Sequence, residues 1–168
     1  MNEVAAQIVV NGTPRELVVP ARELLLDTLR ERLGLTGAKR SCDVQVCGTC
    51  TVLVDGEPVS ACTYLTCDAD GREVLTIEGF AEHPEFAEFE RAFVDRAALQ
   101  CGFCTPGFVL TLKALRDAGE LRSREDVIRG LDGNVCRCTG YKSIVEAAEL
   151  LIGEPATAAA PGAPEAAR

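Results

Sequence analysis

Residues 42–50 are Cys-Asp-Val-Gln-Val-Cys-Gly-Thr-Cys, so three cysteines fall within nine residues. A fourth, Cys62, follows a short segment that contains Asp55-Gly56. The spacing C-x4-C-x2-C with a more distant fourth cysteine is that of plant-type [2Fe–2S] loops. Each iron of such a cluster needs two thiolates, and backbone N–H groups of a short loop can hydrogen-bond the sulfurs. Cys42, Cys47, Cys50 and Cys62 therefore form the first candidate ligand set.

A second group of cysteines lies in the C-terminal half of the chain. It consists of Cys101, Cys104, Cys136 and Cys138, with the spacing C-x2-C-x31-C-x1-C. Each pair is predicted at a helix end, so two loops that meet at one end of a helical bundle would hold a second binuclear cluster. Taken alone, the spacing also permits a four-cysteine zinc site in either group, although C-x1-C is tighter than the usual zinc knuckle.

The remaining cysteine and the lone histidine are not predicted as ligands. Cys67 is interpreted as an ordinary small apolar residue, because a free cysteine is often buried in that role. His83 is interpreted as a loop residue. The chain has neither a P-loop nor a G-x-G-x-x-G motif, so nucleotide and flavin sites are expected on other polypeptides.

Composition and charge exclude several classes of protein. The net charge of −9 argues against a nucleic-acid binder, which would present a basic face. A hydrophobic fraction of 47% is too high for a disordered chain, yet no apolar run is long enough to cross a membrane. Residues 1–20 lack the pattern of a secretory signal, which disfavours a disulfide framework and predicts a cytoplasmic protein.

Hydrophobic periodicity and turn signals predict an α+β fold with two domains. Short β-rich runs flank Asn11-Gly12 and Asp55-Gly56, which are strong hairpin signals. A helical stripe covers 22–33, and no β-rich run follows Gly79. The predicted strands are 7–10, 15–19, 51–54, 57–61 and 73–77, and the later helices are 84–99, 105–118, 124–131 and 142–152. The expected domains are 1–79 and 80–153, followed by a disordered Ala/Pro/Gly tail over 154–168.

Two motifs give the sequence a specific resemblance. Gln100–Gly107 is Gln-Cys-Gly-Phe-Cys-Thr-Pro-Gly, and Cys136–Tyr141 is Cys-Arg-Cys-Thr-Gly-Tyr. In this order, behind the first cysteine loop, they resemble the small iron–sulfur subunit of the molybdenum hydroxylases, the xanthine dehydrogenase, aldehyde oxidoreductase and carbon monoxide dehydrogenase family. The resemblance covers about residues 4–152. It implies a β-grasp ferredoxin-like domain followed by a four-helix [2Fe–2S] domain.

The resemblance also implies a function. The chain would be the electron-transfer subunit of an oxidoreductase and carry two [2Fe–2S] clusters but no substrate site. Its partners would be a large molybdopterin subunit and a medium FAD subunit, as separate polypeptides in a dimer of heterotrimers. Gln100 and Cys138 would contact the pterin, which puts the helical-domain cluster nearest to it. The first loop would face the flavin and is expected to be the more exposed. A stand-alone ferredoxin-like carrier and a zinc-stabilised interaction module remain alternatives.

The first loop departs from a pattern common in this family, C-G-x-G-x-C-G-x-C. Asp43 and Gln45 occupy the first two glycine positions, and only Gly48 is kept. Because residues other than glycine resist positive φ, we expect the path of the loop and its N–H···S bonds to differ from the glycine-rich form. The C-D-x-x-x-C-G-x-C form resembles small subunits of three-subunit enzymes, such as carbon monoxide dehydrogenase and relatives that act on N-heterocycles.

Overall fold

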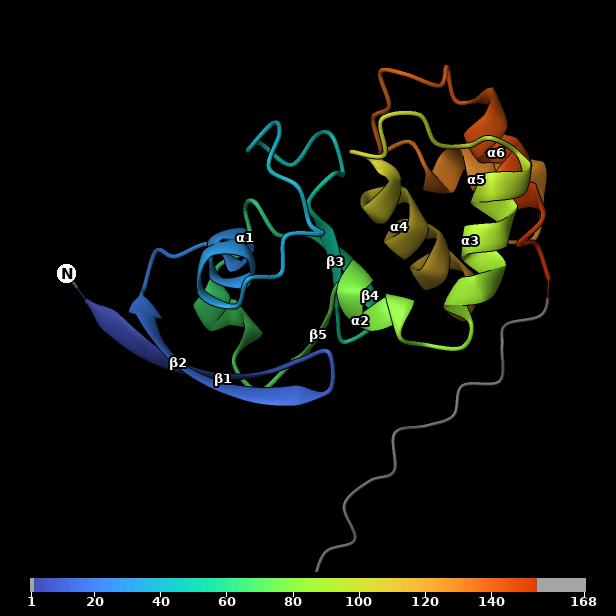
Figure 1. Cartoon of the computed structure of the whole chain (residues 1–168). Coiled ribbons are helices and arrows are strands. Elements are labelled where there is room, and N and C mark those ends of the chain that lie inside the picture. Colours follow the sequence, from blue (N-terminus) through green and yellow to red (C-terminus); the bar gives the residue numbers. More distant parts are fainter. Residues whose placement is uncertain (1, 154–168) are drawn as a thin grey trace, which may run out of the picture.

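The computed structural model describes residues 2–153, so the predicted tail, 154–168, lies outside the described residues. The N-terminal part is a mixed sheet with the strand order β2-β1-β5-β3-β4 (Figure 1). β1 and β5 are parallel, and the other neighbouring strands are antiparallel. The strands are β1 (Glu3–Val10), β2 (Thr13–Pro20), β3 (Thr51–Val54), β4 (Glu57–Ser60) and β5 (Glu73–Leu75).

Both predicted hairpin turns are confirmed. Asn11 and Gly12 have φ of 50° and 72°, and Asp55 and Gly56 have φ of 52° and 85°. Two successive residues with positive φ match the right-handed twist of the flanking strands, which is why Asn-Gly and Asp-Gly pairs favour such turns. These turns fix the register of β1 on β2 and of β3 on β4.

The predicted helix over 22–33 is shorter than expected and changes its winding. It consists of α1 (Leu25–Asp27) and a π-helical turn, η1 (Thr28–Arg32). The leucine stripe still faces the sheet, because Leu25, Leu26 and Leu29 are wholly buried. Inside the same core, the hydroxyl of Thr28 is 2.7 Å from that of Thr66, in the 3₁₀ turn η2 (Thr66–Ala69).

The C-terminal part is helical, with one helix more than the sequence predicted. The predicted strand over 73–77 ends at Leu75, and α2 (Ile77–Ala81) begins within that range and crosses the domain boundary expected between residues 79 and 80. Phe80 of α2 packs edge-on against Phe89 with ring centroids 5.1 Å apart, which ties α2 to the helical core. The other helices are α3 (Phe86–Asp95), α4 (Thr105–Asp117), α5 (Arg124–Gly130) and α6 (Lys142–Glu149).

Strand β3 joins the two hydrophobic cores. All four of its residues are buried, as expected for a strand covered on both faces. Since side chains alternate along a strand, Val52 and Val54 join the core beneath α1, whereas Leu53 packs into the helical core. α4 lies against β3, and Figure 1 shows the start of α4 beside the loop that precedes β3.

Candidate metal centres

The first cysteine group lies in the loop between η1 and β3 and just after β4. Cys50 and Cys62 are buried at the base of this loop, and Cys42 and Cys47 are half-buried at its outer part. The thiol of Cys62 influences the pKa of Cys50, and that of Cys47 influences the pKa of Cys42, so each thiol lies close to its partner. The four sulfurs therefore form an inner pair and an outer pair.

Three left-handed residues shape the outer part of this loop. Asp43, Gln45 and Gly48 have φ of 55°, 59° and 66°. Alternating left- and right-handed residues turn successive N–H groups toward one side, which creates a concave anion-binding surface. The N–H of Val46 accordingly donates to Cys42 Sγ over 3.4 Å. Asp43 and Gln45 therefore adopt positive φ, although residues other than glycine resist this conformation.

Side-chain contacts explain how the two residues that replace glycine adopt this conformation. The Asp43 carboxylate accepts a hydrogen bond from Arg40 over 2.8 Å, and Arg40 also pairs with Asp27. The Gln45 side-chain oxygen accepts a hydrogen bond from Thr63 over 3.2 Å. A non-glycine residue in the left-handed region costs about 1–3 kcal/mol and persists only where its surroundings hold it.

The second group is assembled from two distant segments of chain. Cys101 and Cys104 precede and cap α4, and Cys136 and Cys138 lie in the connection between α5 and α6. The sulfurs of the exposed residues Cys101 and Cys138 are 3.5 Å apart. Cys104 and the buried Cys136 influence each other's pKa, so their thiols are neighbours as well. Among residues 2–153, no three His, Cys, Asp or Glu side chains converge as the ligands of a single metal ion would.

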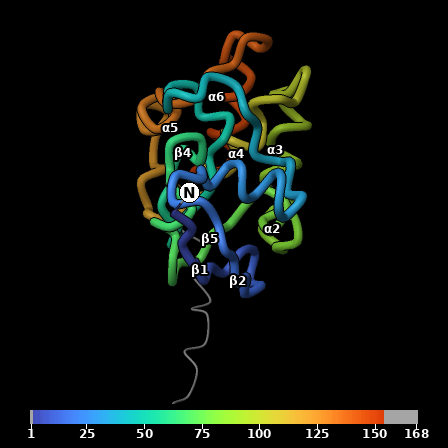
Figure 2. Tube along the Cα trace, turned by 90° about the vertical axis from the view of Figure 1, so that its left-hand side faces the viewer, coloured from blue at the N-terminus to red at the C-terminus, as the bar shows by residue number. Residues whose placement is uncertain are grey.

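The two cysteine loops contact each other directly. The N–H of Val135 donates to the carbonyl of Cys47 over 2.9 Å, which links a residue adjacent to Cys136 with the first loop. Beside this bond, the buried Asn134 donates to the carbonyl of Gly48 over 3.4 Å. Figure 2, turned by 90°, also shows the loop before β3 against the segment that leads to α6. Two hydrogen bonds therefore connect the two cysteine loops.

Gly107 allows this close approach. It lies in the first turn of α4, and a Cβ at this position would be 2.1 Å from the carbonyl oxygen of Gly48. Because real Cβ atoms do not approach a backbone atom so closely, any side chain at this position would push α4 away from the first loop. The glycine that ends the Cys-Thr-Pro-Gly run thus sets the spacing between the two cysteine groups.

Local hydrogen bonds prepare some of the thiols for metal binding, which requires thiolates. Hydrogen bonds from the N–H groups of Val44 and Val46 lower the pKa of Cys42 to about 6. Burial opposes ionisation of Cys136, but hydrogen bonds from the hydroxyl and N–H of Thr139 outweigh it and lower the pKa of this thiol. A hydrogen bond from the N–H of Phe103 lowers the pKa of Cys101.

Three other thiols of the two groups behave in the opposite way. Burial raises the pKa of Cys50 to about 12, and burial followed by the contact with Cys136 raises the pKa of Cys104 to about 12. The contact with Cys101 raises the pKa of Cys138. A bound metal ion deprotonates coordinating thiols outright, so a raised pKa does not prevent these residues from serving as ligands.

The first loop is exposed over residues 43–46, but its cysteines are less exposed than two of those in the second group. Cys101 and Cys138 are exposed, whereas Cys42 and Cys47 are half-buried. The reason is that the first loop wraps its own backbone around its outer sulfurs. The second site is made from two segments that leave one side open. Gln100, which is also exposed, precedes Cys101 on that open side.

The other residues noted in the sequence lie outside both groups. His83 lies between α2 and α3, with its Nδ1 atom 3.7 Å from Glu85. Cys67 is in η2 on the sheet side, where its thiol donates to the carbonyl of Ala21 over 3.6 Å. No helix within residues 2–153 has both the length and the apolar character needed to cross a membrane.

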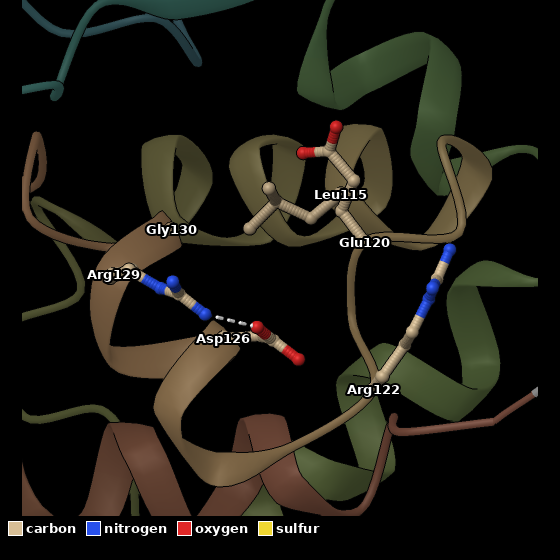
Figure 3. A pocket seen from close by; sticks show the side chains of 6 residues that line it. All are labelled: Leu115, Glu120, Arg122, Asp126, Arg129 and Gly130. Carbon is tan, nitrogen blue, oxygen red and sulfur yellow. Dashed lines mark hydrogen bonds and ion pairs between the residues drawn. The ribbon is translucent and has the colours of Figure 1, made fainter.

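A surface hollow of about 480 Å³ lies between the end of α4 and α5, away from the cysteines (Figure 3). Three of its four charged side chains already have partners, since Arg129 pairs with Asp126 over 2.5 Å and Arg122 donates to the carbonyl of Gly119. The hollow therefore offers no convergent set of unpaired groups. It is lined by Leu115, Glu120, Arg122, Asp126, Arg129 and Gly130.

Comparison with known proteins agrees with this architecture. Residues 8–75 match the 2Fe-2S iron-sulfur cluster binding domain, and residues 76–149 match the [2Fe-2S] binding domain. The chain is 41% identical over 144 residues to the nicotinate dehydrogenase small FeS subunit of Eubacterium barkeri, covering 86% of this chain and 92% of the relative. The chain belongs to the small [2Fe–2S] subunits of the molybdenum hydroxylase family.

Two further matches cover nearly all of both proteins compared. The nicotine 6-hydroxylase small subunit of Paenarthrobacter nicotinovorans is 44% identical, with 87% of this chain and 88% of the relative covered. In the crystal structure of quinoline 2-oxidoreductase from Pseudomonas putida 86, a chain superposes with a TM-score of 0.83 and 37% identity, covering 90% and 94%.

Membership of this family assigns the chain its role. It is an electron-transfer subunit of an oxidoreductase, with two [2Fe–2S] clusters, and molybdopterin and FAD are carried by partner subunits. The substrate site is not on this chain. A stand-alone carrier and a zinc module are not favoured, since the relatives are subunits of dehydrogenase and hydroxylase complexes.

Proposed function

We propose that the eight paired cysteines ligate the two clusters, with each sulfur pair holding one iron. The first cluster uses Cys42 with Cys47 and Cys50 with Cys62. The second uses Cys101 with Cys138 and Cys104 with Cys136. In tetrahedral coordination with metal–sulfur bonds of about 2.3 Å, two sulfurs on one metal are about 3.8 Å apart. The 3.5 Å between Cys101 and Cys138 is the observation that carries this pairing.

Metal analysis tests the ligand set. The complex assembled without oxygen should contain two irons and two acid-labile sulfides per cluster, and no stoichiometric zinc. Cys104→Ser should lose or alter only the helical-domain cluster, while the matched change Cys67→Ser should leave both intact. About one zinc per cysteine group without sulfide would reject the assignment.

We also propose the order of electron transfer. The helical-domain cluster receives electrons next to the pterin, with Gln100 and Cys138 as the pterin contacts, and the β-grasp cluster passes them to the flavin. Two features support this order. Gln100 and Cys138 lie on the open side of the second site. The hydrogen bond from Val135 to Cys47 offers a short path from the second cluster to the first.

Rapid mixing with substrate, followed by freezing and electron spin resonance, tests the order. A Cys47→Ser complex should reduce its molybdenum and helical-domain cluster and then stall before the flavin. A Cys104→Ser complex should stall earlier, with its β-grasp cluster still oxidised. If the Cys47→Ser complex keeps its helical-domain cluster oxidised while molybdenum is reduced, the order is reversed. The proposed contact of Gln100 with the pterin is then rejected as well.

The remaining proposals concern the assembly. The relatives named as small subunits support larger partner subunits, and we propose a dimer of heterotrimers in the cytoplasm. We further propose domains of 1–79 and 80–153, which the two domain matches support by meeting between residues 75 and 76. Light scattering on the purified complex measures the copy number, and a mass of one heterotrimer would contradict the dimer.

A further inference from the structure

Three donors converge on the sulfur of Cys136, which is only 7% exposed. The N–H groups of Cys138 and Thr139 each approach the Sγ atom to 3.4 Å. The hydroxyl of Thr139 comes closer, at 3.2 Å. The backbone donors follow from the path of the chain, but the hydroxyl is present only because residue 139 is threonine.

The hydroxyl of Thr139 is held so that its proton points to the sulfur. The N–H of Tyr141 donates to Thr139 Oγ1 over 3.2 Å, so the oxygen already accepts a hydrogen bond. In the described part of the chain, the only acceptor for the hydroxyl proton is Cys136 Sγ. A threonine hydroxyl has a single proton to donate, and here that proton has one destination.

Tyr141 closes a ring that fixes this arrangement. Its φ of 69° is unusual for a tyrosine, and such a conformation survives only where the surroundings impose it. Its phenol oxygen accepts a hydrogen bond from the N–H of Cys136 over 3.0 Å. The backbone of Tyr141 thus orients Thr139, and its side chain returns to the residue that Thr139 contacts.

The first cysteine group contains a similar threonine in a different situation. Thr49 Oγ1 is 3.2 Å from Cys47 Sγ, but it is also 3.2 Å from the carbonyl oxygen of Lys39. Its single proton therefore has two competing acceptors. A hydroxyl that donates to a carbonyl gives the neighbouring sulfur no positive charge, so Thr49 is expected to influence its sulfur less than Thr139 does.

We propose that the Thr139 hydroxyl raises the reduction potential of the helical-domain cluster through its hydrogen bond to Cys136. The inference rests on the ligand set proposed above. One-electron reduction adds a negative charge to the cluster and its thiolates, and a donor aimed at a thiolate stabilises the reduced state more than the oxidised one. No proton is transferred, and Thr139 is a positioning residue that acts through a ligand.

The test is an anaerobic redox titration of the intact complex, with each cluster followed by its electron spin resonance signal. Thr139→Val should lower the reduction equilibrium constant of the helical-domain cluster about tenfold, which is about 59 mV for one electron. The β-grasp cluster should be unchanged. Thr139→Ser, which keeps the hydroxyl, should retain the wild-type potential. Thr49→Val is the matched control. It should lower the reduction potential of the β-grasp cluster by less than Thr139→Val lowers that of the helical-domain cluster.

Iron and sulfide analysis of the same samples separates this inference from the assignment of the clusters. If wild type lacks sulfide, the ligand set and this inference both fail. If Thr139→Val holds both clusters at wild-type potentials, only this inference is overturned. Should Thr139→Val lose the cluster, Thr139→Ala decides, since it removes the hydroxyl without filling its place. A wild-type potential in Thr139→Ala overturns the inference, and a lowered one supports it.

Discussion

The two cysteine groups hold four sulfurs each but reach this arrangement by different routes. Three of the first four cysteines lie in one short loop whose path is fixed by left-handed residues and by contacts within the same domain. The second group brings 101–104 together with 136–138 across two helical connections. The first site therefore carries most of its own geometry, whereas the second depends on how helices pack.

The second group of cysteines depends on the first loop for its position. Its first segment is positioned by the close approach of Gly107 to Gly48. Its second segment is positioned by two hydrogen bonds, from Asn134 to Gly48 and from Val135 to Cys47. The first loop is thus both a candidate cluster site and the support for the other. Damage at this contact is expected to affect the helical-domain cluster before the β-grasp cluster.

The largest effect is expected from Gly107→Ala. The added Cβ would lie 2.1 Å from the Gly48 carbonyl oxygen, and the start of α4 would have to move with Cys104. Overpacking of a fixed interior costs about 1–3 kcal/mol. The helical-domain cluster should be lost or unstable while the β-grasp cluster remains, as measured by iron content and the spectra of the two clusters.

Gly133→Ala is the matched control for that substitution. Gly133 lies beside Asn134, but a Cβ there meets no atom within 4 Å, and its φ is not in the left-handed region. This variant should resemble wild type. Equal behaviour of the two glycine variants would mean that close approach at Gly107 does not hold the second site together.

The next effect concerns the loop that carries its own geometry. In Asp43→Val, a β-branched residue would have to adopt φ near 55° without the Arg40 ion pair. The expected cost is about 1–3 kcal/mol, seen as faster loss of the β-grasp cluster in denaturant. Asp43→Gly should stay close to wild type, because glycine adopts this conformation freely. Stable cluster in both variants would show that the left-handed path is not required.

Much of this architecture could be predicted from the sequence, because its strongest signals are local. Asn11-Gly12 and Asp55-Gly56 predict the two hairpins, and both are confirmed. The helix predicted over 124–131 is α5, and the hydroxyl of Ser123 just before it accepts the hydrogen bond from the N–H of Asp126. Turn and cap signals depend on a few neighbouring residues, so they can be recognised without knowing how distant parts of the chain pack.

The features that the sequence did not predict depend on distant partners. α2 was missed because Phe80 is held by Phe89 and not by any helical period of its own. The roles of Gly107 and Asn134 appear only once 48, 107 and 134 are brought together. Thr139 was noted within its motif without a role, although a hydroxyl three residues after a candidate ligand is a usable signal for a hydrogen bond to its sulfur.

A smaller effect is expected from Asn134→Ala. This side chain is 5% exposed and donates to Gly48 across the contact of the two loops. Its loss leaves a buried carbonyl with fewer donors and should cost about 1–3 kcal/mol in the free energy of unfolding. Asp132→Ala, at an exposed neighbour, is the control and should be neutral. Denaturant unfolding of the cluster-loaded complex compares the two, and equal midpoints would contradict a role for Asn134.

The smallest effect is expected from Cys67→Ser, which separates the ninth cysteine from the other eight. Cys67 is half-buried in η2, and its thiol contacts the carbonyl of Ala21 and no other sulfur among the described residues. A serine hydroxyl can donate to the same carbonyl, so the change in stability should stay within about 0.5 kcal/mol, as for substitutions away from a packed core. Iron, sulfide and both cluster spectra should be unchanged.

The control for Cys67→Ser is Cys62→Ser, which replaces a proposed ligand in the same domain. Cys62 is 3% exposed and pairs with Cys50, so replacing its sulfur should remove or alter the β-grasp cluster and leave the helical-domain cluster in place. If Cys67→Ser instead lost a cluster and Cys62→Ser did not, the fourth ligand of the first group would be Cys67. The inner pair beneath the loop would then have to be reassigned, because Cys62 is the thiol that lies next to Cys50.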